Sequence, residues 1–317
     1  MKKFMPEGCL INTKENQTAL MSKAGLKDAY YSKRILEARA VMCDKDHNLH
    51  VDLGIMKGII PRDEGAVGIS EGSVRDIAII SRVNKPVCFR ISGFQEDTAG
   101  NTYALLSRRQ VQQDCIDEYI SRMRPGDIID AKVTHMESFG VFADIGAGIS
   151  ALMPIDSISV SRIPHPSVRF SPGDDIKAVV RQRDSENRIT LSFKELLGTW
   201  EQNAESFSPG ETVPGIIRSV EKYGIFVELK PNLAGLAEYV PDVKPGQHAS
   251  VYIKSLIPER MKIKLIIVDS FDAEYPRSDI EYFVEEGHID RWIYSPEKCE
   301  KVIETEFSDE ERDLMGA

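Results

Sequence analysis

Two short motifs place aromatic side chains at strand positions where a soluble protein usually has polar ones. Residues 139–142 read FGVF and residues 223–226 read YGIF, so both follow the pattern aromatic-Gly-x-Phe. If the alternate residues of these strands face a core, Phe142 and Phe226 must face solvent. A nucleobase stacked on an exposed ring contributes roughly 1 to 3 kcal/mol, and a neighbouring glycine leaves room for a flat ligand. We therefore predict stacking platforms at Phe139 and Phe142 and at Tyr223 and Phe226. The alternative is that the rings fold over a barrel end as a small apolar cluster.

Basic side chains share this outward parity. They are Lys132, Arg183 and Arg188 around the first motif, and Arg218, Lys254, Lys262 and Lys264 around the second. A stripe of cations interleaved with aromatics can hold a single-stranded phosphate backbone while its bases stack. Each cation taken singly is equally consistent with ordinary surface solubility.

A repeated pattern of strands positions both motifs. Residues 125–154 align without a gap with residues 209–238, and similarity resumes at the Pro-Gly pairs that begin at Pro172 and Pro245. Apolar and polar residues alternate within each copy, with Val141 and its alternate neighbours inward, which predicts five short strands with one buried face. Because so few strands make no stable open sheet, we expect each copy to close into a small OB-type barrel.

A weaker copy precedes these two, between Ile35 and Arg109. It has His47 and His50 where the other copies have aromatic rings, so these histidines are weaker candidates for the same binding role. Together with Cys43 they also suggest part of a metal site. Residues 47 and 50 have opposite strand parity and no fourth ligand is near in the sequence, so we predict no metal.

The predicted fold class is therefore mainly β, with two or three tandem five-stranded OB-fold barrels joined by short helices. The expected segments are an N-terminal helical extension at 1–34, a degenerate first barrel at 35–109, a linker helix at 110–122, a second barrel at 123–195, a linker helix at 196–206, a third barrel at 207–269 and an acidic C-terminal extension at 270–317.

The net charge of −10 is concentrated at one end of the chain. Residues 270–317 contain 15 acidic and 5 basic side chains, so the remainder is neutral and can present a basic face. The extension is either a solvated segment or a competitor of RNA for that face. The five cysteines are scattered without a CxxC pair, and neither a signal peptide nor a long apolar run is present, so we expect a cytoplasmic protein.

These residues resemble the S-one RNA-binding domain, the OB-fold repeat of bacterial ribosomal small-subunit protein one. The resemblance covers residues 123–269 well and residues 35–109 more weakly, through PGD, FGVF, SALMP and RITLS. It implies an RNA face formed by two aromatics, a histidine after the third strand, and an Asp and an Arg around the last hairpin. Phe139, Phe142, Asp184 and Arg188 match in the second copy, and Tyr223, Phe226 and Lys262 match in the third.

The chain departs from this family pattern at the histidine position, which holds Pro154 in the second copy and Glu238 in the third. The first copy is similar to the degenerate leading repeats of the family, which implies a ribosome-docking module rather than an RNA-binding one.

The function expected from the sequence is low-specificity binding of single-stranded RNA, in particular mRNA, with a ribosomal-protein-one-like role in translation. The ribosome is an expected partner through the first barrel. The alternatives are a protein-interaction module and an RNA chaperone or RNA-turnover adaptor. No nucleophile elbow, P-loop or dinucleotide fingerprint is present, so we expect neither an enzyme nor a cofactor.

Overall fold

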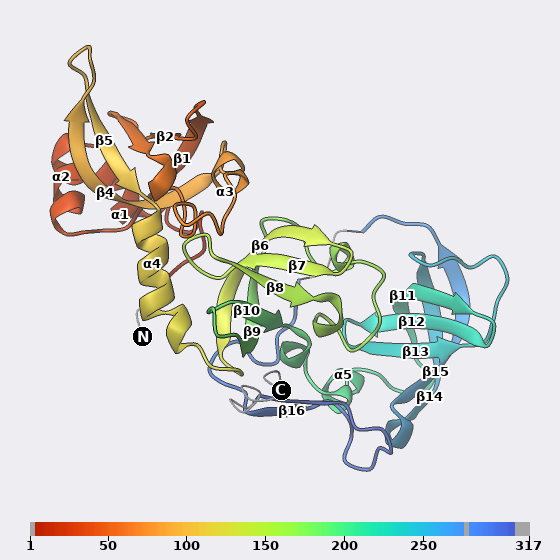
Figure 1. Cartoon of the computed structure of the whole chain (residues 1–317). Helices are drawn as coiled ribbons and strands as arrows, with labels where there is room; N and C mark the ends of the chain where they lie inside the picture. Colours follow the sequence, from red (N-terminus) through yellow and green to blue (C-terminus); the bar gives the residue numbers. More distant parts are fainter. Residues whose placement is uncertain (1–3, 276–278, 308–317) are drawn as a thin grey trace. The chain divides into compact units, whose positions relative to one another are not determined.

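Three closed five-stranded β-barrels follow one another along the chain (Figure 1). The structure is a computed structural model and describes residues 4–275 and 279–307. The predicted fold class, mainly β with tandem OB-type barrels, is confirmed. The chain divides into two compact units, of which the first contains the residues up to Met123 together with 130–132 and 144–150. The second unit contains the other residues.

All three barrels have the same strand order, in which the third and fifth strands pair in parallel. The first barrel consists of β1 (Leu36–Cys43), β2 (Leu49–Asp52), β3 (Lys57–Ile60), β4 (Pro86–Glu96) and β5 (Thr102–Ser107). The second consists of β6 (Ile128–Glu137), β7 (Gly140–Asp144), β8 (Ser150–Pro154), β9 (Asp175–Arg183) and β10 (Ile189–Ser192). The third consists of β11 (Thr212–Glu221), β12 (Gly224–Lys230), β13 (Leu233–Ala237), β14 (His248–Ile257) and β15 (Lys262–Phe271).

Short helices and a small sheet complete the described chain. The α-helices are α1 (Lys14–Leu20), α2 (Lys23–Tyr31), α3 (Ile77–Ile80), α4 (Arg109–Glu118) and α5 (Trp200–Ala204). Single turns of 3₁₀ helix lie at Arg62–Glu64, Ile120–Arg122, Ile155–Ser157, Pro166–Val168, Lys194–Leu197 and Pro258–Arg260. Strands β16 (Arg291–Ile293) and β17 (Glu304–Glu306) pair with each other. No helix within residues 4–275 and 279–307 is long and apolar enough to cross a membrane.

Alternation of side chains explains the barrel cores. The inward positions Val141, Ala143 and Ile145 of the second barrel are at most 1% exposed, and Ile217, Ile225 and Val227 of the third barrel are fully buried. The Pro-Gly pairs open the strands for a conformational reason. Their glycines, Gly126, Gly173, Gly210 and Gly246, have φ between +94° and +97°, a region that residues with a Cβ rarely adopt.

A β-bulge interrupts the alternation in the first strand of the first barrel and of the third barrel. In β11 the register shifts between Ile217, which pairs with Val227, and Ser219, which pairs with Phe226. The first barrel has the same shift between Ala40 and Met42 of β1. A bulge inserts one extra residue and so redirects every following side chain to the other face. Residues after the bulge therefore face the side opposite to that expected from simple alternation.

The helical segments differ in detail from their sequence-based ranges. The N-terminal segment forms two helices, because Ser22 caps a second helix with its side chain. In the linker predicted at 196–206, only Trp200–Ala204 is α-helical. Gly198 has φ of +79°, which ends the preceding 3₁₀ turn, and a capping box at Thr199 and Gln202 then starts α5. The part of the N-terminal extension at residues 1–3 lies outside the described residues.

A buried ion pair anchors the N-terminal segment within the first compact unit. The Arg108 guanidinium donates through Nε to Glu7 Oε1 at 2.6 Å and through Nη2 to Glu7 Oε2 at 3.0 Å. Both side chains are at most 4% exposed. Burial acts to raise the pKa of Glu7, but the charge of Arg108 outweighs it, so this pKa lies below its usual value.

Asp144 extends this buried network. Its carboxylate accepts hydrogen bonds from the backbone N–H groups of Glu7, Gly146 and Gly148. Burial, together with the nearby charge of Glu7, raises the pKa of Asp144 to about 6. The outward position that simple alternation suggests for Asp144 is therefore wrong, because this side chain is 3% exposed.

The described part of the C-terminal extension is packed against the barrels of the second unit. Trp292 and Tyr294 belong to the apolar core of the third barrel. The Ile289 N–H donates to the Gly126 carbonyl at 2.9 Å, and the Tyr294 carbonyl accepts from Trp200 N–H at 2.9 Å. Residues 279–307 are therefore not a free acidic tail. The strand β15 runs to Phe271, past the boundary drawn at 269 in the sequence, and residues 276–278 and 308–317 of the extension lie outside the described residues.

Candidate nucleic-acid interface

The outer surface of the third barrel carries a row of side chains that begins at the bulge. The strand register pairs Ser219 with Phe226, Phe226 with Leu236, Leu236 with Lys264, and Lys264 with Ser255. Tyr223 is 71% exposed, and its ring meets that of Phe226 edge-on, with centroids 6.1 Å apart and planes at 85°. Two rings and a lysine therefore lie on one outward surface, which we call the third-barrel row.

The second barrel has the corresponding surface with an additional ring. Phe139 is 55% exposed, and its ring meets Phe142 edge-on at 6.0 Å and 89°. His135 supplies the additional ring. Its imidazole centroid lies 6.2 Å from the Phe142 centroid, and the two ring planes differ by only 20°. We call His135, Phe139 and Phe142 the second-barrel rings. Sequence reasoning missed His135.

His135 was missed because side chains do not alternate regularly between the two faces of β6. Strict alternation from the buried Val133 would place residue 135 on the core side of β6. The His135 side chain is nevertheless 62% exposed. The equivalent residue of the third barrel is Ser219, which follows the bulge and pairs with Phe226. A signal was present in the sequence, because a run of polar residues, Thr134 and His135, interrupts the alternation where a bulge is expected.

The glycines of the two aromatic motifs are required by strand packing. A Cβ on Gly140 would lie 2.4 Å from the Met153 carbonyl oxygen, and one on Gly224 would lie 2.6 Å from the Ala237 carbonyl oxygen. Such approaches are too close for any side chain. The sequence suggested that these glycines make room for a ligand. Close contact with the neighbouring strand explains them more simply.

The hairpin between β9 and β10 positions the predicted Asp and Arg. Asp184 Oδ1 accepts from the backbone N–H groups of Glu186 and Arg188, which shapes the turn. Asp184 Oδ2 accepts from Arg188 Nε at 2.7 Å, and the Arg188 side chain remains 74% exposed. Although burial acts to raise the pKa of Asp184, these hydrogen bonds hold that pKa below its usual value. Arg183 donates to Asn187 in the same turn.

The predicted cations of the third barrel divide into two groups. Lys254, Lys262 and Lys264 are exposed, and Lys264 lies in the third-barrel row. Arg218 is the bulged residue and instead pairs with the buried Glu228, donating at 2.8 and 2.9 Å. The Glu228 carboxylate also accepts from Arg169 at 2.5 Å. Arg218 is 10% exposed and is held in this internal network, so we do not include it in the interface.

Lys132 is less exposed than the three lysines of the third barrel. It lies on β6 before the position of His135, is half-buried, and belongs to the short segment 130–132 of the first compact unit. The rings, the Asp184 hairpin and the three lysines are therefore outward groups, each on its own barrel. Arg218 is instead held by the buried Glu228.

The first barrel carries different chemistry at the equivalent positions. His50 pairs in register with Met42 on one side and with Ile59 on the other. His50 Nε2 lies 3.1 Å from Asp44 Oδ2, and His47 Nδ1 lies 3.2 Å from Asp76 Oδ2. Both imidazoles are thus engaged by carboxylates, and a carboxylate beside them repels phosphate. Within the described ranges, no group of three potential metal-ligating side chains is close enough to hold an ion.

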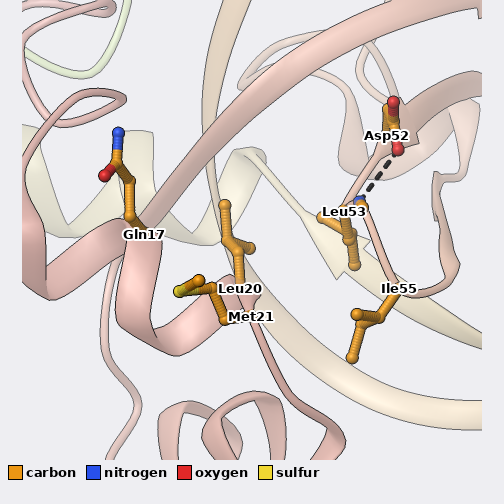
Figure 2. A pocket seen from close by; sticks show the side chains of 7 residues that line it. Gln17, Leu20, Met21, Asp52, Leu53 and Ile55 are labelled. Atoms are coloured by element: carbon orange, nitrogen blue, oxygen red, sulfur yellow. Dashed lines mark hydrogen bonds between the residues drawn. The ribbon is translucent and has the colours of Figure 1, made fainter.

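Apolar side chains are exposed on the first barrel. Val41 is 53% exposed and Met42 is 49% exposed, directly at the bulge of β1. A separate shallow groove of about 580 Å³ lies between α1 and the turn after β2 (Figure 2). Its lining is largely apolar and is formed by Gln17, Leu20, Met21, Asp52, Leu53, Gly54 and Ile55.

The barrels and their exposed rings define a tandem OB-fold protein with the surface of a single-strand nucleic-acid binder. Residues 122–194 match the family model of the S1 RNA binding domain, the S-one domain of the sequence resemblance. The second barrel therefore lies within the segment that matches this domain model.

Curated relatives extend this similarity along the chain. The small ribosomal subunit protein bS1 of Staphylococcus aureus (strain COL) is 26% identical over 292 residues, which cover 86% of this chain and 70% of that protein. A small ribosomal subunit protein bS1 homolog of Bacillus subtilis (strain 168) is 36% identical over 138 residues, which cover 42% of this chain and 36% of that protein. The recognition of the S1 family from sequence is confirmed.

Solved structures give a weaker match. A multidomain protein with nucleic acid binding domains from Streptococcus pneumoniae TIGR4 is 12% identical, and the match covers 77% of this chain and 74% of that one. Its TM-score is 0.24, a value that adds nothing to the fold assignment.

Proposed function

We propose that this chain binds single-stranded, weakly structured RNA with low sequence specificity, in a role in translation like that of ribosomal protein S1. The observation that carries the proposal is a repeated pair of rings in nearly the same edge-on geometry, the exposed Phe139 with the half-buried Phe142 and the exposed Tyr223 with the half-buried Phe226. Stacking on such rings tolerates any base, because every base has a π face.

The S1 domain match and the bS1 relatives support this function. We propose that the interface uses Phe139, Phe142, Arg183, Asp184 and Arg188 of the second barrel and Tyr223, Phe226, Lys254, Lys262 and Lys264 of the third. Asp184 would act by holding Arg188, because a carboxylate does not itself attract phosphate. The relatives are ribosomal proteins. We accordingly propose a cytoplasmic, non-catalytic role for this chain.

The electrostatic part of the proposal predicts a strong salt dependence. For an unstructured RNA oligonucleotide, log K should fall linearly with log salt, with a slope of about −0.7 for each phosphate contact. The double variant Lys262→Ala, Lys264→Ala should reduce this slope by about 1.4 if each lysine holds one phosphate. Fluorescence anisotropy titrations at several salt concentrations measure the slope.

A matched control is available on α2. Lys23 and Lys27 are both exposed on this helix of the first unit, so replacing them by alanine removes the same charge away from the proposed interface. We expect this control to leave the slope unchanged. An equal reduction in both double variants would contradict a specific role for Lys262 and Lys264.

We further propose that the natural RNA is mRNA and that the first barrel contacts the ribosome rather than RNA. Two features support a protein partner for this barrel. The histidines at the ring positions are engaged by Asp44 and Asp76, and Val41 and Met42 are exposed beside them. A small apolar surface edged by carboxylates suits a partner with apolar and basic side chains.

Sedimentation with ribosomes tests this docking role. The wild-type chain should sediment with ribosomal subunits after nuclease has removed unprotected mRNA, and the double variant Val41→Asp, Met42→Asp should lose this association. Val302→Asp is a control, because Val302 is 63% exposed and lies in the C-terminal extension. If sedimentation disappears on nuclease treatment of the wild type, the association depends on mRNA and the docking role is wrong.

A further inference from the structure

The second barrel differs from the third in one outward residue beside the stacking rings. His135 and Ser219 occupy equivalent positions of the repeat, and Ser219 follows the bulge of β11 and pairs in register with Phe226. In the second barrel the imidazole of His135 is nearly parallel to the Phe142 ring, at 20° and 6.2 Å. The two barrels therefore present three rings and two rings, respectively, on equivalent surfaces.

The exposure of His135 indicates a role other than packing. Its side chain is 62% exposed, so its contact with Phe142 buries little of the imidazole. A ring that contributes so little to the core, yet lies nearly parallel to the outward, half-buried Phe142 ring, offers a flat surface to a ligand.

The hydrogen bonding of His135 distinguishes its face from its edge. His135 Nε2 lies 2.7 Å from Glu137 Oε1, so one ring edge is already occupied by a carboxylate. The negative charge of Glu137 also disfavours a phosphate at that edge. Glu137 is 48% exposed and leaves the face of the imidazole open to a planar group.

We propose that His135 is a third base-stacking residue of the second barrel, held in place by Glu137, and that this barrel stacks one more nucleobase than the third barrel does. This inference rests on the proposed RNA-binding function and refines it. It makes the second barrel the stronger of the two RNA sites, and it assigns the difference to a single residue.

The test compares variants of the full-length chain in binding to an unstructured RNA oligonucleotide. His135→Ala should weaken binding about 5- to 150-fold, the range for loss of one stacked base, with an unchanged salt slope. His135→Phe should restore most of the affinity, because a phenyl ring stacks without a charge. Ser219→His should strengthen binding, because it adds the equivalent ring beside Phe226.

Three other outcomes would overturn the inference. If His135→Ala flattens the salt slope and His135→Phe does not restore binding, His135 contacts phosphate. If His135→Ala lowers the melting temperature and binding in proportion, its role is structural. If His135→Ala has no effect while Phe142→Ala weakens binding, the proposed function stands without a third ring. Absence of RNA binding by the wild type would instead reject the proposed function itself.

Discussion

Replacing Phe142 and Phe226 together by alanine should weaken single-stranded RNA binding by about 2 to 6 kcal/mol, because each ring is expected to stack one base at roughly 1 to 3 kcal/mol. The melting temperature should change little. Both rings lie on the outer surface of their barrels, beside Phe139 and Tyr223 and away from the buried Val141 and Val227. Anisotropy titration and thermal unfolding of the same preparations measure the two effects.

Two controls separate stacking from stability. Tyr31→Ala removes an aromatic ring that is 79% exposed on α2, and should leave RNA affinity unchanged. Val141→Ala should cost roughly 1 to 3 kcal/mol of stability through loss of buried packing, and should spare the binding surface of the folded fraction. If the double aromatic variant unfolds and RNA binding falls only in proportion, then the rings are core residues and the proposed surface is wrong.

Arg108→Ala should destabilise the first compact unit by about 3 to 5 kcal/mol. The substitution removes the main cation beside the buried Glu7 carboxylate and leaves it Arg82, whose Nη1 lies 3.2 Å away. A buried charge that loses its best partner is strongly unfavourable. Arg108 Nη1 also donates to the Gly65 carbonyl, which would lose that partner. Urea unfolding followed by far-ultraviolet circular dichroism should show an earlier transition for this unit.

The adjacent residue supplies a control. Arg109 pairs with Glu64 at 2.6 Å but is 38% exposed, so Arg109→Ala should cost less than about 1 kcal/mol. The double variant Glu7→Gln, Arg108→Met removes both charges and should recover much of the loss, because a neutral pair leaves no uncompensated charge. Equal destabilisation by Arg108→Ala and Arg109→Ala would contradict the importance of burial.

The barrels could be predicted from sequence because their signals are local. Alternation around Val141 and Val227, and the positive φ that the Pro-Gly pairs require, are properties of a few neighbouring residues. The outward positions of Phe142 and Phe226 follow from the same alternation. These predicted positions agree with the structure because one face of each strand is buried, and a buried face fixes the register of its strand.

The remaining features depend on residues distant in the sequence or on irregular backbone. The bulge of β11 brings Arg218 into contact with Glu228, and the alternation of β6 ends after Val133, so that His135 is exposed. Simple alternation assigns neither residue correctly. Glu7 and Arg108 are separated by a whole barrel in the sequence, so no local pattern reveals their pairing. Charge counting likewise described the C-terminal extension as an acidic tail, although Trp292 and Tyr294 pack into the third barrel.

This packing has a consequence for the order in which the chain folds during synthesis. Domains generally fold from the N-terminus as they emerge, and the first barrel draws its core from residues 19–106 alone. The core of the third barrel includes Trp292 and Tyr294, so it stays incomplete after β15 has been made. Until those residues leave the ribosomal exit tunnel, the nascent third barrel exposes apolar surface that later becomes buried. A translational pause between codons 271 and 292 would therefore prolong the aggregation-prone stage.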